Sequence, residues 1–204
     1  MRKTPEKLQL SNILHRNKII SYLNQGKVGL FPTDTVYGIC CRMDKKSAVE
    51  RIFDIKKRDR SKPFLVLADS LKTAERYIEL DLDPQKKSII DKYWPGALTI
   101  AFKAKPEKVF PIIRASKNTI AFRVPDYSFL TDIIAQVGVP IVAPSANISG
   151  KLTPHEFEAV DKRIVDNVDF IVVGECKMGI ASTIIDFSEK KVNVIREGSI
   201  KVEL

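Results

Sequence analysis

Short apolar segments that alternate with amphipathic segments limit the possible folds of this chain more than any other feature. Apolar runs at 28–31, 64–67 and 140–143 are too short for a helix and are typical of buried strands. Between such runs, apolar residues recur every three or four positions, as in 13–23 and 129–137. Because strands and helices alternate through most of the chain, the sequence predicts an α/β sheet flanked by helices.

Three further strands are expected close together near the C-terminus, at 170–173, 183–187 and 192–195. Their clustering predicts a mixed sheet rather than a purely parallel one. Pro154 is expected to start a helix ahead of them. No internal repeat, low-complexity segment or linker interrupts the pattern, and 204 residues suit one large domain. We therefore expect a single domain over residues 1–204.

Composition narrows the class of protein. The apolar fraction of 44% and the charged fraction of 29% are ordinary for a globular protein. No apolar run approaches the roughly 20 residues of a membrane span, and the charged N-terminus lacks the apolar core of a secretory signal, so we expect a cytoplasmic protein that is not in a membrane. The net charge of +9 favours an anionic partner (a nucleotide, a nucleic acid or a membrane surface), although many proteins are basic without one.

Residues of the common catalytic and metal motifs are scarce. The cysteines Cys40, Cys41 and Cys176 form no CxxC pair, so reduced buried thiols are expected and a metal site is not. His15 and His155 are the only histidines in the sequence, and neither accompanies a Ser or Cys triad motif. Neither GxxxxGK[ST] nor GxGxxG occurs, so any nucleotide chemistry would not use the common phosphate loops.

Three polar loops lie at the ends of apolar strands, at 32–35, 56–63 and 144–150. In α/β sheets ligands usually bind in the crevice beyond the strand ends, so these loops are candidate ligand contacts. The loop KKRDRSKP at 56–63 suits a polyphosphate, with a solvated run of charges as the alternative for any one of its cations. The loop PSANISG at 144–150 offers hydroxyls and an amide that either cap turns or hold a ligand.

One arginine, Arg123 in the segment IAFRVPD, interrupts an apolar strand. A buried arginine needs an anionic partner, and the sequence leaves open whether this is a structural aspartate or the carboxylate of a substrate. Nearer the C-terminus, Gly174 and Gly179 precede the polar pair at 182–183, and Arg196 precedes Gly198. A glycine before a short polar segment would allow the backbone to approach a ligand closely.

Seven segments, taken in order, resemble the YrdC family of threonylcarbamoyl-AMP synthases. The matching segments are FPTDTVYGI, IFDIKKR, WPGALTI, TIAFRVPD, VAPSANISG, GIASTIIDF and IREGSI. The resemblance implies a twisted mixed parallel and antiparallel sheet, flanked by helices, around a basic concave groove. It also implies that L-threonine, bicarbonate and ATP are converted to threonylcarbamoyl-AMP and pyrophosphate, for threonylcarbamoyladenosine modification of tRNA.

The same resemblance implies roles for individual residues. Lys56 and Arg58 match the family's KxR pair and would be catalytic. The residues expected to contact ATP are Lys56, Arg58, Lys62, Thr119, Ser145, Asn147, Thr153, Ser182 and Arg196. The residues expected to contact L-threonine are Thr33, Tyr37, Arg123 and Ala143. Mg²⁺ would accompany ATP, and the expected macromolecular partners are tRNA and downstream threonylcarbamoyl transferase proteins.

The chain departs from the family pattern at three places. Many longer relatives carry a histidine after the strand that follows the KxR pair, where this sequence has Leu67 and Ala68. Ala181 stands where many members have a glutamate. The sequence ends at Leu204 without the second domain that covers the site in longer relatives, so we expect any closure of the site to be local.

Two other functions are weighed against the synthase. A non-catalytic module that binds double-stranded RNA or tRNA would suit the positive charge, and ATP binding that depends on Lys56 and Arg58 would separate it from the synthase. Carbamoyl transfer in hydrogenase maturation is disfavoured, because that family carries an acylphosphatase domain and CxxC pairs that this sequence lacks.

Overall fold

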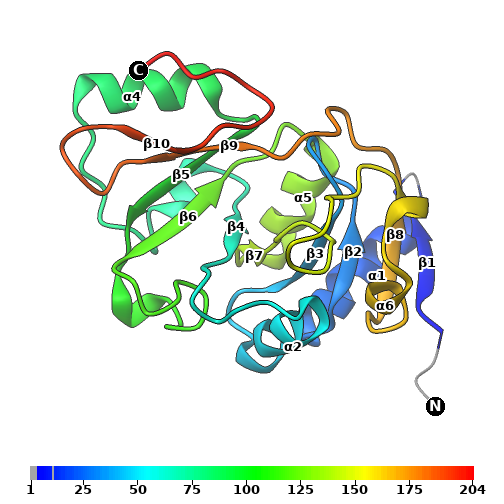
Figure 1. Cartoon of the computed structure of the whole chain (residues 1–204). Helices are drawn as coiled ribbons and strands as arrows, with labels where there is room; N and C mark the ends of the chain where they lie inside the picture. Colours follow the sequence, from blue (N-terminus) through cyan, green and yellow to red (C-terminus); the bar gives the residue numbers. More distant parts are fainter. Residues whose placement is uncertain (1–3, 11) are drawn as a thin grey trace.

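The short apolar runs form the strands of one sheet in the computed structural model, which describes residues 4–10 and 12–204 (Figure 1). In chain order the strands are β1 (Glu6–Gln9), β2 (Gly29–Phe31), β3 (Gly38–Arg42), β4 (Leu65–Leu67), β5 (Leu98–Lys103), β6 (Thr119–Arg123), β7 (Ile141–Val142), β8 (Phe170–Val173), β9 (Thr183–Asp186) and β10 (Asn193–Arg196). Among the described residues these ten strands pair in the order β1-β8-β2-β3-β7-β4-β6-β5-β9-β10.

The sheet contains both parallel and antiparallel pairs, as the clustered late strands predicted. β2 runs antiparallel to β3 and parallel to β8. β5 runs antiparallel to β6 and parallel to β9. The expected mixed α/β sheet is therefore confirmed.

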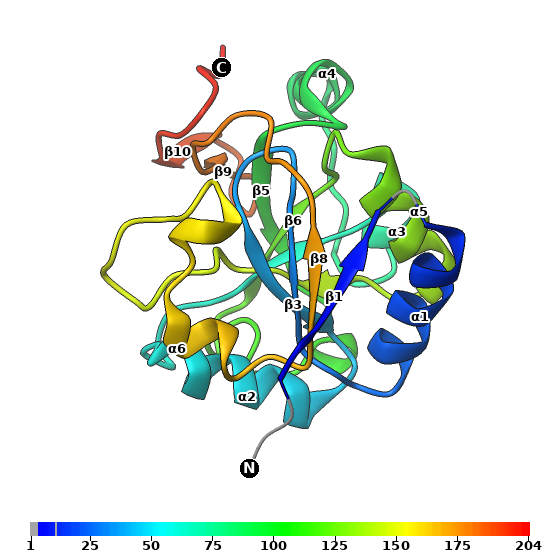
Figure 2. The same ribbon diagram turned by 90° about the vertical axis from the view of Figure 1, so that its right-hand side faces the viewer.

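Helices cover both faces of the sheet (Figure 2). They are α1 (Ile13–Asn24), α2 (Lys46–Lys56), α3 (Leu71–Ala74), α4 (Pro84–Tyr93), α5 (Ser128–Val137) and α6 (Lys162–Val165), with two 3₁₀ turns, η1 (Pro106–Lys108) and η2 (Phe157–Ala159). α1 and α5 pack together on one face, and α2 and α6 lie on the opposite face. No helix within the described residues is both long and apolar enough to cross a membrane.

Neighbouring strand residues reach opposite faces because side chains alternate along a strand. Leu30 packs in the core that also contains the apolar side chains of α2, whereas Phe31 packs in the core formed with α1 and α5. In β3, Ile39 likewise packs in the core that contains the side chains of α2, and Cys40 packs in the core formed with α1 and α5. Coverage of both faces explains why the central strands are continuous apolar runs in the sequence.

Two elements differ from the sequence-based expectation. Pro154 does not start a helix: the chain bends through η2, and α6 begins only at Lys162, where the Asp161 carboxylate accepts the N–H of Arg163. The Pro154 carbonyl instead accepts the N–H of Tyr37 at 3.1 Å, so a tertiary hydrogen bond takes the place of a helical one. β1 was missed because it has only four residues and only Leu8 of them is buried, which leaves too little alternation to detect.

Candidate functional site

Strand ends and loops from distant parts of the chain surround a cavity of about 360 Å³. The turn between β2 and β3 supplies Thr33, Thr35 and Val36, and the loop after β7 supplies Pro144 and Ser145. The remaining lining residues are Gly38, Arg58, Pro63, Phe64, Leu65, Thr99, Ala101, Lys117, Thr119, Ala121, Arg123, Ala143, Thr153, Ala181, Ser182, Ile184, Ile195 and Arg196. All three polar loops noted in the sequence therefore reach one cavity.

The PTDT turn is held by the hydroxyl of Thr33. This oxygen accepts the N–H of Thr35 at 3.1 Å and the N–H of Val36 at 3.2 Å, and it donates to the carbonyl of Val36 at 2.8 Å. Thr33 is only 2% exposed. Its hydroxyl is thus engaged within the turn, and Thr33 shapes the wall of the cavity.

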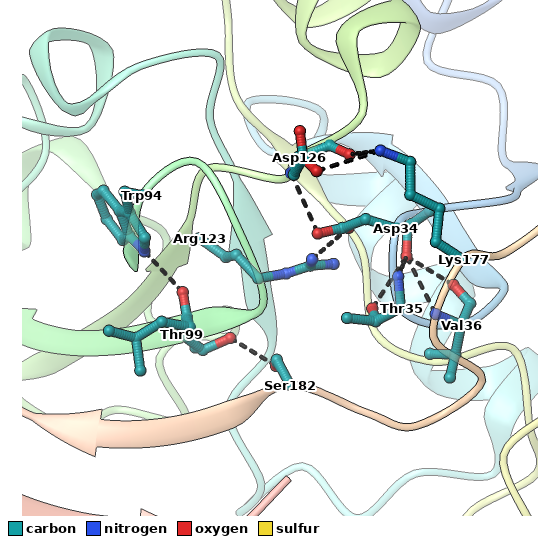
Figure 3. A network of polar contacts seen from close by, with 11 residues as sticks. Asp34, Thr35, Val36, Trp94, Thr99, Arg123, Asp126, Lys177 and Ser182 are labelled. Carbon is teal, nitrogen blue, oxygen red and sulfur yellow. Dashed lines mark hydrogen bonds and ion pairs between the residues drawn. The ribbon is translucent and has the colours of Figure 1, made fainter. Parts of the chain in front are cut away.

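Asp34 of the same turn forms a buried ion pair with Arg123 (Figure 3). One Asp34 oxygen accepts from a terminal nitrogen of the guanidinium, and the other accepts the N–H of Asp126 at 3.1 Å. The Nε of Arg123 is buried and has no hydrogen-bond partner among residues 4–10 and 12–204. The sequence left open whether the partner of Arg123 is a structural aspartate or a substrate carboxylate. The structure shows the aspartate, and the Arg123 guanidinium also lines the cavity.

Two other guanidiniums enter the cavity without a carboxylate. Arg58 donates to the carbonyls of Lys62 at 3.2 Å and Pro63 at 2.8 Å, and Arg196 donates to the carbonyl of Ser182 at 2.7 Å. In the part of the chain that the structure describes, neither forms an ion pair with Asp or Glu. Burial lowers the pKa of both, and the charge of Arg196 further lowers the pKa of Arg58. Two nearby cations without a counter-ion form a place for an anionic ligand.

Lys56 lies outside the lining of the cavity. It is the last residue of α2 and is 1% exposed. Its Nζ donates to the carbonyl of Ser145, to the carbonyl of Asn147 at 2.7 Å and to the side-chain oxygen of Asn147 at 3.3 Å. Burial, and then the positive charge of Arg58, lower the pKa of Lys56 to about 7.

Asn147 organises the loop after β7. Its side-chain oxygen accepts the Ser145 hydroxyl at 2.6 Å, and its amide nitrogen donates to the carbonyl of Lys151 at 2.6 Å. Both polar atoms of the Asn147 side chain are therefore used inside the loop. Ser145 itself lines the cavity.

Tyr37 is fully buried behind the cavity. Its hydroxyl donates to the carbonyl of Gly174 at 2.6 Å and accepts the N–H of the same residue at 3.2 Å. Burial raises the pKa of Tyr37 to about 12. These two hydrogen bonds hold the segment after β8 against the start of β3. Lys62, another of the predicted site residues, is exposed on the loop before β4.

The structure brings nine of the thirteen predicted site residues to the cavity: Thr33, Arg58, Thr119, Arg123, Ala143, Ser145, Thr153, Ser182 and Arg196. Four do not line it: Tyr37, Lys56, Lys62 and Asn147. Their proposed contacts with substrates stay predictions, and three of them contact loops that do line the cavity.

Sequence reasoning missed three polar residues of the cavity. Thr35 belongs to the PTDT turn but was given no role. Thr99 shares a 2.8 Å hydrogen bond with the Ser182 hydroxyl (Figure 3), and it lies in an apolar run whose burial masked it. Lys117 is exposed, and its segment carries no motif that could have identified it.

The donor set of the cavity consists of cations, hydroxyls and backbone groups. Among the described residues no three His, Cys, Asp or Glu side chains are grouped to hold a metal ion. Asp34, which pairs with the lining residue Arg123, has both oxygens occupied by protein donors. A divalent cation would therefore suit this cavity as part of an ATP complex.

Comparison with known proteins points to one family. The Sua5/YciO/YrdC family model, described as telomere recombination, matches residues 21–198. A relative from Methanocaldococcus jannaschii is 36% identical over 193 residues, which cover 92% of this chain and 89% of the relative. The threonylcarbamoyl-AMP synthase of Bacillus subtilis is 32% identical over 207 residues, which cover 98% of this chain but 55% of that enzyme.

Solved structures agree with this assignment. Pyrococcus abyssi Sua5 in complex with L-threonine superposes with a TM-score of 0.87 and 29% identity, over 96% of this chain and 58% of that protein. Escherichia coli YciO has the same fold, with a TM-score of 0.84 and 24% identity over 97% of this chain and 96% of that protein. The chain thus spans a little over half of its longer relatives and nearly all of its shorter ones. It belongs to the Sua5/YciO/YrdC family.

Proposed function

We propose that this chain is an L-threonylcarbamoyladenylate synthase, an enzyme that makes threonylcarbamoyl-AMP and pyrophosphate from L-threonine, bicarbonate and ATP. The proposal rests on one cavity that contains two kinds of arginine, those that donate to backbone carbonyls and one that forms an ion pair. Arg58 and Arg196 have no carboxylate partner among the described residues, whereas Arg123 is paired with Asp34 of the PTDT turn. Relatives named threonylcarbamoyl-AMP synthase, and the L-threonine complex of Sua5, support this reading.

In this proposal Arg58 and Arg196 bind the phosphates of ATP, with Lys62 reaching them from the rim. Hydroxyl groups of Thr119, Ser145, Thr153 and Ser182 line the same cavity and supply neutral hydrogen-bond donors. The guanidinium of Arg123, which lines the cavity, would bind the carboxylate of L-threonine, with Thr33 and Ala143 in the same cavity wall.

The reaction has two steps. The amine of L-threonine combines with bicarbonate to give a carbamate and water. A carbamate oxygen then bonds to the α-phosphorus of ATP, the bond to the β-phosphate oxygen breaks, and pyrophosphate leaves, which makes the enzyme a nucleotidyltransferase. The attacking carbamate carries no proton that must be removed, so the step needs no general base.

The side chains of the cavity would act by position and charge. Both reactants are anions, and cations that neutralise the phosphates allow them to approach and stabilise the departing pyrophosphate. Mg²⁺ enters the proposal as part of the substrate, bound to ATP. A cytoplasmic location, where ATP and tRNA are available, and transfer of the product to tRNA by downstream threonylcarbamoyl transferase proteins belong to the same proposal.

The test is to incubate the purified protein with ATP, Mg²⁺, bicarbonate and labelled L-threonine, and to measure pyrophosphate and a labelled adenylate. We expect both products, and we expect neither when bicarbonate is omitted or when Arg58 is replaced by alanine. Arg60→Ala is the matched control, because Arg60 pairs with Asp54 outside the cavity. A protein that binds RNA but neither ATP nor L-threonine would instead be the non-catalytic binding module.

A further inference from the structure

One buried amino group, the Nζ of Lys56, contacts the loop 144–151, which carries Ser145 of the cavity wall. Three oxygen acceptors surround the Nζ of Lys56, and all belong to Ser145 or Asn147. The Lys56 side chain is 1% exposed and does not line the cavity. Its amino group therefore contacts the back of the loop that lines the cavity.

The backbone of the loop 144–151 is also attached to the C-terminal end of α2 and to Tyr37. The N–H of Ser149 donates to the Lys56 carbonyl at 3.0 Å, and the N–H of Ala146 donates to the Tyr37 carbonyl at 2.7 Å. Inside the loop, hydrogen bonds converge on the Asn147 side chain. If the Lys56 amino group is removed, the carbonyl of Asn147 loses this donor and the carbonyl of Ser145 keeps the N–H of Asn147 at 3.0 Å. A carbonyl left unpaired is unfavourable when buried.

The backbone conformation at Lys57 explains why Lys56 and Arg58, the two cations of the KxR pair, have different surroundings. Lys57, just after the end of α2, adopts a left-handed conformation with φ of 49°. Left-handed residues at this position end a helix and redirect the chain. Lys56 consequently stays beneath the loop 144–151, and Arg58 turns into the cavity.

We propose that Lys56 is a positioning residue, which holds the loop 144–151 in the shape that binds both substrates and does not itself contact the phosphates of ATP. This inference deepens the proposed function and rests on it. Because Ala143, Pro144 and Ser145 line the cavity together with Arg58 and Arg123, displacement of the loop affects the sites for ATP and for L-threonine alike.

The experiment compares Lys56→Met, Lys56→Arg and the control Lys57→Met, which alters the exposed neighbouring lysine. Amide hydrogen exchange is followed for a peptide over 143–151 and for a reference peptide over 98–103. For Lys56→Met we expect exchange in 143–151 to accelerate roughly tenfold or more, with no change at 98–103. Lys57→Met should match the wild type, and Lys56→Arg, which keeps N–H donors, should recover part of the protection.

Binding and kinetics complete the test. Calorimetry of Lys56→Met should show that the affinities for Mg²⁺–ATP and for L-threonine both fall, by about tenfold or more, and KM should rise for both substrates more than kcat falls. Unchanged exchange at 143–151, together with a loss of affinity confined to ATP, would overturn the proposal and make Lys56 a phosphate ligand. If Lys56→Met does not fold, Lys56→Arg decides between the same outcomes. If the wild type binds neither substrate, the proposed function fails, while hydrogen exchange still shows whether Lys56 holds the loop.

Discussion

At the scale of single residues, charge placement decides what each cation can do. Arg58 has carbonyl partners and, in the described part of the chain, no carboxylate partner, so its positive charge is available to a ligand. Arg123 forms an ion pair with Asp34 and still lines the cavity. Lys56 is surrounded by oxygens of a loop. Three cations near one cavity therefore have three different surroundings.

Replacement of Arg58 by alanine tests the phosphate assignment directly. We expect the affinity for Mg²⁺–ATP to fall about tenfold or more, because a charge-assisted hydrogen bond contributes about 1.5–3 kcal/mol. Affinity for L-threonine should change less than about twofold, since Arg58 has no proposed contact with it. Calorimetry with each ligand separately measures both effects. Equal losses for both ligands would contradict the assignment of Arg58 to the phosphates.

Lys56 also predicts a pH dependence of stability. Its pKa is about 7 in the folded protein against an ordinary value of 10.5. Between these values the unfolded chain keeps a proton that the folded protein has released, so a rise in pH favours folding. We expect the free energy of unfolding of the wild type to rise relative to Lys56→Met between pH 7.5 and 9.5, by at most about 1.4 kcal/mol per pH unit. Urea unfolding of both proteins at several pH values measures the difference, and parallel curves would contradict it.

At the scale of elements, the C-terminal hairpin forms part of the cavity only because its backbone packs closely on a neighbouring segment. β9 and β10 pair antiparallel, and the chain after β10 returns along 181–183, where the N–H of Ser199 donates to the carbonyl of Ala181 at 2.9 Å. This return path keeps Arg196 against the carbonyl of Ser182. The hairpin thus brings a cation from the end of the chain to the cavity.

Gly198 makes this approach possible, and Gly198→Ala tests it. A Cβ at this position would overlap the backbone of Ala181, Ser182 and Thr183, which cannot move as easily as a side chain. We expect destabilisation of about 1–3 kcal/mol from this overpacking and a loss of affinity for Mg²⁺–ATP as Arg196 is displaced. Urea unfolding and calorimetry measure the two effects. Ser199→Ala is the matched control, since it removes a buried hydroxyl that has no partner, and it should not destabilise.

At the scale of the whole molecule, the cavity joins segments that are far apart in sequence. The PTDT turn, Arg58, Arg123, Ser145 and Arg196 come from five parts of the chain and from both halves of the sheet. Binding at such a site should stabilise the complete fold rather than one element. We accordingly expect residues 1–204 to unfold in one cooperative transition, as a single domain.

Ligand-dependent melting tests this coupling. Mg²⁺–ATP at about 100 times its dissociation constant contributes about 2.7 kcal/mol, which corresponds to a rise in Tm of about 5–10 °C for a domain of this size. Circular dichroism and tryptophan fluorescence should report the same Tm, with and without ligand. At the same ATP concentration Arg58→Ala should keep about half of the ATP shift or less, since a tenfold weaker affinity leaves about 1.4 kcal/mol, and it should keep the shift with L-threonine. Two separate transitions, of which only one responds to ligand, would contradict the single-domain expectation.

Local patterns in the sequence were enough to predict the order of most strands and helices and the mixed character of the sheet. Apolar runs identify strands that are covered on both faces, because burial on both sides requires apolar residues at every position. Polar loops at strand ends likewise predicted part of the cavity, including Thr33, Arg58 and Ser145. Arg123 was predicted as a cation within an apolar strand, and the role of Arg196 came from the resemblance to a known family. These features depend on residues that are close together in the chain, so a single sequence contains them.

Only the tertiary structure decided which way each polar group faces. Lys56 and Arg58 are two positions apart in one motif, and a left-handed residue between them separates their surroundings. Arg123 pairs with Asp34, which lies 89 positions away in the sequence. Pro154 does not start a helix, and its carbonyl accepts the N–H of Tyr37. Such hydrogen bonds and ion pairs form between segments that are distant in the chain and adjacent in space. Their partners are fixed by the packing of the whole sheet, which the spacing of residues along the chain does not encode.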